Sequence, residues 1–176
     1  MNRFATVLTG SLLAGATLFG ATKTPEPRPL EEQVRRELVT LPFYNVFDNL
    51  TYSVVGDEVI LSGQVTRPTL RSSAENVVKR LAGVAKVSNH IEVLPLSPFD
   101  NRLRLALYRS IYSQPGLDRY ALGAIPGIHI IVKNGNVTLE GVVNNEMERN
   151  LAFLKANGVS GVFQVENNLR VAGAGK

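Results

Sequence analysis

The sequence predicts an α+β fold made of two tandem copies of one small domain, each with the element order αββαβ. The main observation is an internal repeat, because residues 59–93 align without a gap with residues 137–171. The second observation is periodicity. Stretches with helical apolar spacing and stretches with alternating apolar residues follow one another in the same order in both copies. We therefore expect two domains, each a small three-stranded sheet with two helices.

The elements of each copy follow from local patterns. Apolar residues three or four positions apart predict the helices, and period-two alternation with tight turns predicts the strands. Pro68 suits the first turn of a helix, and Gly83 and Gly161 suit the position after a helix. In the first copy we expect a helix at 30–41, strands at 50–55 and 59–65, a helix at 68–81 and a strand at 86–93. In the second copy we expect a helix at 100–112, strands at 128–132 and 137–143, a helix at 145–156 and a strand at 163–171.

Two matched residue pairs suggest structural roles. Gly63 and Gly141 lie in the second strand of each copy, where glycine permits close approach of a helix or marks a bulge. Asn89 and Asn167 lie in the last strand, and we expect their side chains to hold local backbone.

The copies differ between the first helix and the first strand, where the second copy has an extra stretch of several residues, around 113–127. Insertions in loops are tolerated at low cost and often carry function. Residues 95–98, Pro-Leu-Ser-Pro, separate the copies. Because this linker is short, we expect the two domains to pack together or keep limited orientations.

The N-terminus indicates export. One basic residue, Arg3, precedes an uncharged stretch at 4–21, so we interpret residues 1–21 as a signal peptide. An uncleaved membrane anchor and a buried core helix are the alternatives. Residues 22–29 contain three prolines and form a Pro-rich spacer. The expected location is the periplasm or the exterior, with membrane anchoring if the segment is not cleaved.

The composition offers few residues of the kinds that catalyse reactions or bind metals. There is no cysteine, which excludes disulfides and thiol catalysis, and the net charge of +4 is scattered, which disfavours a nucleic-acid partner. His90 and His129 lie within predicted strands without further ligands at metal-binding spacing. We expect no catalytic residues, no metal, no cofactor and no small-molecule substrate.

One basic and aromatic cluster begins the second copy, and it suits the interface of an anionic membrane, where guanidinium groups contact phosphate. We expect its three helical arginines on the solvent side. The alternative is an ordinary helix with a solvated back, whose tyrosines pack against the insertion. The candidate lipid-binding residues are Arg102, Arg104, Tyr108, Arg109, Tyr112, Arg119 and Tyr120.

The repeat resembles the BON domain of bacterial envelope proteins. The resemblance lies in "GDEVILSGQV" and "NGNVTLEGVV", in the following helix with Ala74 or Ala152, and in "GVAKVSNHIEV" and "GVFQVENNLRV". It indicates one BON domain at 30–95 and another at 99–172. The resemblance implies an αββαβ fold and a role in envelope maintenance or osmotic stress. Some relatives bind anionic phospholipid and one branch binds potassium. Known dual-BON lipoproteins depend on an acylated cysteine, which this chain lacks.

These observations favour a non-catalytic envelope protein that binds anionic phospholipid through its second domain. The alternative is a protein-interaction adaptor or chaperone-like periplasmic module with an envelope protein as partner, which uses sheet edges or the groove between the domains. A third hypothesis, an ion-binding sensor, lacks an acidic cluster in the sequence. An enzyme is the least favoured class.

Overall fold

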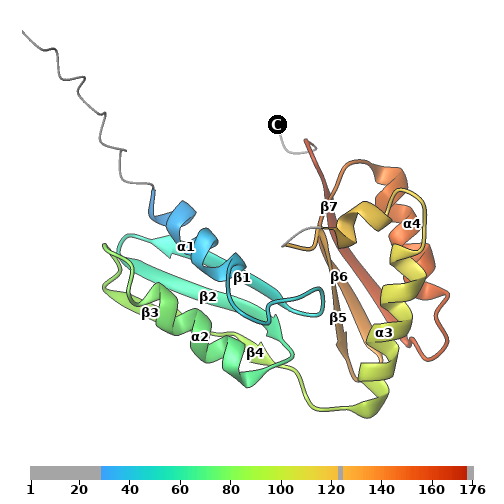
Figure 1. Cartoon of the computed structure of the whole chain (residues 1–176), viewed down its shortest axis with the longest axis horizontal. Helices are drawn as coiled ribbons and strands as arrows, with labels where there is room; N and C mark the ends of the chain where they lie inside the picture. The colour runs from blue at the N-terminus through green and yellow to red at the C-terminus, as the bar shows by residue number, and fades with distance from the viewer. Residues whose placement is uncertain (1–28, 123–124, 174–176) are drawn as a thin grey trace, which may run out of the picture.

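A computed structural model describes residues 29–122 and 125–173 (Figure 1). The predicted signal peptide at 1–21 lies outside the described residues, as does the predicted spacer apart from Pro29. The described chain folds into two α+β units, one with each copy of the repeat, which confirms the predicted fold class. No helix in the described ranges is long and apolar enough to cross a membrane.

The first unit contains two helices on one mixed sheet. Strand β1 pairs antiparallel with β2, and β3 and β4 pair parallel with β2. The third strand, predicted as one element, is thus interrupted at His90 and Ile91. A parallel pair needs a crossover, and α2 supplies it. The elements are α1 (Leu30–Val39), β1 (Asn49–Val55), β2 (Glu58–Val65), α2 (Pro68–Val78), β3 (Lys86–Asn89) and β4 (Glu92–Val93).

The second unit repeats this topology with an uninterrupted third strand. β5 pairs antiparallel with β6, and β7 pairs parallel with β6. Its first helix begins at Pro98, two residues before the predicted start, because the Ser97 hydroxyl caps it by accepting from the N–H of Asp100 at 3.1 Å. The elements are α3 (Pro98–Tyr112), a 3₁₀ turn η1 (Asp118–Ala121), β5 (Ile128–Lys133), β6 (Asn136–Val143), α4 (Glu146–Asn157) and β7 (Gln164–Val171).

In each unit the two helices lie on one face of the sheet (Figure 1). A hydrophobic core fills the space between them in each unit. The first core contains Val34, Leu38, Val59, Leu61, Val65, Leu70, Ala74 and Val78. The second contains Leu103, Leu107, Ile111, Ile128, Ile130, Val132, Val137, Leu139, Ala152 and Ala156. The helical and alternating spacings in the sequence therefore correspond to the buried faces.

The matched glycines allow close approach of a strand, not of a helix. Gly63 has φ +107°, and a Cβ atom there would lie 2.0 Å from the carbonyl oxygen of Asn49 on β1. Gly141 has φ +129°, and its Cβ would lie 2.2 Å from the carbonyl oxygen of Gly127. The expectation of a close helix was wrong, because the crowding comes from backbone beside the neighbouring strand of the same sheet.

The matched asparagines have the expected structural role. Asn89 donates from Nδ2 to the carbonyl of Arg71 at 3.1 Å and accepts at Oδ1 from the N–H of Ile91 at 3.1 Å. Asn167 makes the same two bonds in the second copy, at 3.1 and 3.3 Å. Each asparagine thus joins the end strand of its sheet to the preceding helix.

The two units pack together through residues 42–48, which we call the docking loop. The N–H of Ile130 on β5 donates to the carbonyl of Val46 at 2.8 Å, and Val46 belongs to the core of the second unit. The Tyr44 ring lies 5.6 Å from the His129 ring. The expectation that the short linker keeps the domains packed is confirmed.

Candidate functional site

Helix α3 presents an exposed face with two arginines and no acidic residue. Because Leu103, Leu107 and Ile111 face the core, the opposite side of the helix lies in solvent. Leu105 is 52% exposed and Tyr108 38% exposed. The one acidic residue of α3, Asp100, is buried and accepts hydrogen bonds from the backbone N–H groups of the β5–β6 turn. We call this surface the α3 face; it consists of Asn101, Arg102, Leu105, Tyr108 and Arg109.

Arg104 does not belong to this face, and the expectation that it points to solvent was wrong. Its side chain is buried, with the residue only 4% exposed. Its guanidinium donates to the carbonyl of Val132 and to Oδ1 of Asn101, both at 2.6 Å. Burial lowers the pKa of Arg104, and the nearby carboxylate of Asp100 opposes that shift. The group therefore stays charged and fastens α3 to the edge of β5.

Tyr112 is also buried. The expectation that its ring is available for a lipid contact was therefore wrong. Its hydroxyl donates to the carbonyl of Ile128 at 2.6 Å, and burial raises its pKa. Its ring centre lies 4.9 Å from that of Tyr108. Tyr112 thus packs against the exposed Tyr108 and, like Arg104, hydrogen-bonds to a backbone carbonyl of the edge strand β5.

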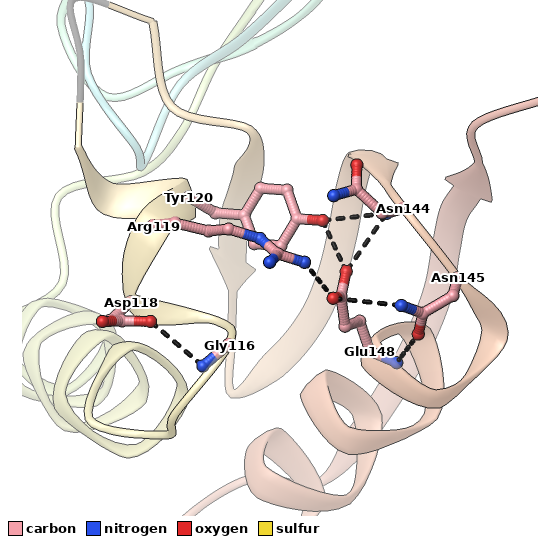
Figure 2. A network of polar contacts seen from close by, with 7 residues as sticks. All are labelled: Gly116, Asp118, Arg119, Tyr120, Asn144, Asn145 and Glu148. Carbon is pink, nitrogen blue, oxygen red and sulfur yellow. Dashed lines mark hydrogen bonds and ion pairs between the residues drawn. The ribbon is translucent and has the colours of Figure 1, made fainter.

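Arg119 and Tyr120, from the insertion, point toward the start of α4 (Figure 2). Arg119 forms an ion pair with Glu148, and the Tyr120 hydroxyl donates to Oε2 of Glu148 at 2.5 Å. The N–H of Asn144 donates to the same oxygen at 3.1 Å. The Asn145 side chain caps α4 by accepting from the N–H of Glu148 at 2.9 Å. This network fixes the insertion on the second domain, and sequence reasoning did not predict it.

The charge of Glu148 is held by these bonds. Burial raises its pKa, but the hydrogen bonds from Tyr120, Asn144 and Arg119 outweigh burial and lower the pKa overall. The carboxylate is therefore ionised and saturated with donors. The positive charge of Arg119 is compensated by Glu148, whereas Arg102 and Arg109 make no ion pair with a described residue.

The first domain extends the α3 face with two residues that sequence reasoning missed. The guanidinium of Arg67 lies 4.8 Å from the ring centre of Phe43, which is 67% exposed. Arg67 and Leu105 line one open groove of about 420 Å³, together with Phe47 of the docking loop. Arg67 and Leu105 lie close together only because of how the domains pack, so no local pattern in the sequence indicates this proximity.

The histidines are separated. His90 lies exposed beyond β3, and His129 is buried against the docking loop. Burial lowers the pKa of His129, and the backbone and charge of Asp48 oppose that shift. Among the described residues, no three side chains of His, Cys, Asp or Glu come together in a group that could hold a metal ion.

The fold defines a tandem α+β repeat protein whose two units are docked through one loop. The sequence matches the BON domain over residues 28–95 and again over residues 100–173, and the chain belongs to this family. BON domains occur in periplasmic and envelope proteins, and their family is generally non-catalytic.

Other comparisons add little. No curated protein matches the sequence. Two solved structures are similar in part, both of CdsD, a structural protein of the type III secretion system of Chlamydia trachomatis. One is 13% identical, covers 82% of this chain and 93% of its own, and has a TM-score of 0.32. The other, its C-terminal domain, is 11% identical, covers 81% and 96%, and has a TM-score of 0.30. Similarity at this level carries no conclusion about function.

Proposed function

We propose that this protein is a non-catalytic envelope protein that binds anionic phospholipid surfaces through the α3 face, in envelope maintenance or osmotic stress. The observation that carries the proposal is the combination of Arg102, Arg109, Leu105 and Tyr108 on one exposed helix side without a carboxylate. Guanidinium groups suit lipid phosphate, and exposed apolar and tyrosine side chains suit the depth of the headgroups.

The expected binding is weak and reversible. Arg102 and Arg109 make no ion pair with any described residue. Each basic residue near an anionic surface contributes about 1 kcal/mol, and salt screens exposed charges beyond about 10 Å at 0.1 M. Arg67 beside Phe43 adds a third cation at the rim of the same surface. A few such contacts give salt-sensitive association and not a permanent anchor.

The corresponding helix of the first domain lacks this character. Its exposed residues include Glu31 and Glu32 as well as Arg35 and Arg36, so opposite charges cancel along α1. A protein that binds membranes through charge alone, wherever arginines occur, would use both helices. The proposal assigns binding to α3 only.

The test is co-sedimentation of the full chain with vesicles. Phosphatidylglycerol in the vesicles should bind the protein at about 0.1 M salt and release it at about 0.5 M, while phosphatidylcholine alone should not bind it. The variant Arg102→Ser with Arg109→Ser should bind roughly 30-fold more weakly. Arg104 is left intact, because its loss would disturb the fold.

The matched control is Arg36→Ser with Arg80→Ser, which removes the same charge from exposed positions of the first domain. It should bind like the parent protein. Equal loss in both double variants would show that only net charge matters, and unchanged binding in the α3 variant would overturn the proposal.

The β5 edge does not support the alternative of an adaptor that extends a sheet edge. Along β5, the carbonyls of Ile128 and Val132 accept from Tyr112 and Arg104, and the N–H of Ile130 is taken by Val46. An edge whose backbone groups are occupied offers no template for another strand. Salt-insensitive capture of an envelope protein, with no vesicle binding, would favour the adaptor.

A further inference from the structure

A cleft of about 340 Å³ lies between the two domains, on residues that the α3 face does not include. Its lining comes from α1 and β1 of the first domain, from Tyr44 of the docking loop, and from the three strands of the second sheet. This volume is at the lower end of the range for small-molecule sites, which often form at domain interfaces.

The charges in the cleft come from both domains. Arg35 on α1 and Arg170 on β7 line it, and neither makes an ion pair with a described residue. Glu140 is the one carboxylate among the described lining residues, and its Oε1 accepts from Asn168 at 2.9 Å. With His129 neutral, two positive charges and one negative charge leave +1, which matches a monoanion.

His129 supplies a buried polar atom in the same lining. The residue is 7% exposed, its ring lies beside the backbone of Asn45 and Asp48, and its Nδ1 makes no well-aligned hydrogen bond with a described residue. A buried polar atom without a partner is rare, because leaving it unsatisfied costs about 1–3 kcal/mol. Tyr44, which lines the cleft beside it, has its pKa raised to about 12 by burial and keeps its hydroxyl proton.

The rest of the lining includes apolar side chains. Val39 and Leu50 are half-buried and Ile125 is exposed on the side of the second domain, while Leu38 behind them belongs to the first core. Such a wall buries an aliphatic chain or a ring, and this burial is worth about 0.8 kcal/mol per CH₂ group. A free inorganic anion would leave this wall unused.

We propose that this inter-domain cleft binds a small monoanionic amphiphile, a carboxylate with an apolar body, between Arg35 and Arg170. The site needs both domains, since neither domain alone brings the two arginines together. It is independent of the α3 face, because α3 contributes no residue to the lining.

The experiment is an NMR titration of the ¹⁵N-labelled full chain with octanoate, using octanol and acetate as comparison probes. Octanoate should shift the amide signals of cleft residues and the imidazole signals of His129, while α3 signals stay in place. Octanol lacks the charge and acetate lacks the tail, so each should bind at least 10-fold more weakly.

The variant Arg35→Ser with Arg170→Ser should bind octanoate at least 10-fold more weakly. The control is Arg36→Ser with Arg80→Ser, which removes two exposed arginines that do not line the cleft and should leave binding unchanged. Octanol binding as tightly as octanoate, unchanged affinity in the cleft variant, or unmoved His129 signals would overturn the proposal. The His129 signals of the parent protein decide the matter even if the cleft variant fails to fold.

Discussion

The first strands of the two copies, β1 and β5, have the same place in their sheets but differ in burial. In β1, Thr51 and Ser53 are exposed, whereas the matched residues His129 and Ile131 of β5 are buried. Both strands pack one face on their own helices. The additional burial of β5 comes from the first domain. Tyr44 of the docking loop lies against His129, and the end of the first sheet lies beside Ile131. Two copies of one fold thus acquired different surfaces through their position in the chain.

The largest expected effect concerns the matched glycines, a position at which the two copies are alike. Gly63→Ala and Gly141→Ala should each lower the free energy of unfolding by roughly 3–5 kcal/mol, because a Cβ meets a carbonyl oxygen and the positive φ is strained. Urea denaturation measures it. The control Gly56→Ala, where a Cβ meets nothing within 4 Å, should cost about 1 kcal/mol. Equal losses at Gly56 and Gly63 would mean that the strand carbonyl can move away.

The next largest effect concerns the first strands, whose matched residues differ in burial between the two copies. Ile131→Ser should cost about 2–3 kcal/mol, because the side chain is buried beside Leu94 of the first domain. Ser53→Ala, at the matched exposed position of β1, should change stability by less than about 0.5 kcal/mol. Similar small effects at both positions would contradict the domain contact.

A third effect concerns the matched positions of the first helices. Helices α1 and α3 can be aligned by their buried residues, Val34 and Leu38 in α1 and Leu103 and Leu107 in α3. In this alignment Arg104 corresponds to Arg35. Arg104→Met should cost about 1–2 kcal/mol in the free energy of unfolding, since the Val132 carbonyl loses its donor.

Its control, Arg35→Met, lies at an exposed position and should leave the urea midpoint nearly unchanged. A stable Arg104 variant would show that the carbonyl of Val132 finds another donor.

The smallest effect is pH dependence. Burial lowers the pKa of His129 below its ordinary 6.5, so the folded state prefers the neutral ring. The stability that this preference contributes is present above pH 6.5 and is lost as the pH falls toward the lowered pKa. Between about pH 7.5 and 5.5, the parent should lose more stability than His129→Gln. An identical pH profile for both proteins would mean that the ring is solvated when the domains are packed.

The sequence predicts elements well where periodicity is strong. The repeat and the hairpins rest on local patterns. Asn89 and Asn167 each make one local bond, to the N–H two residues on, and one bond to the helix 18 residues before. The strand pattern around Gly63 predicts a crowded position but not the neighbour, because a sequence does not tell which backbone approaches a glycine.

The candidate site was predicted in part. Arg104 lies two residues after Arg102, about 200° around the helix, so helical spacing already puts it on the other side. Arg104 therefore does not share a helix face with Arg102 and Arg109. The run Ile128-His129-Ile130-Ile131-Val132 does not alternate, which is a sign of a strand covered on both faces. The Arg119–Glu148 contact joins a loop to a distant helix start, and no local pattern predicts it.

The docking of the two copies is heterologous, since a loop of one meets a strand of the other. A heterologous contact uses two different surfaces, so it can be repeated along an array of copies. A copy that preceded the first domain would place its loop on β1. Here that position is held by Thr51 and Ser53, whose polar side chains offer no apolar surface for it. The exposed face of β1 in the first domain therefore resembles the polar outer face of a capping repeat, whereas the matched face of β5 is an interface.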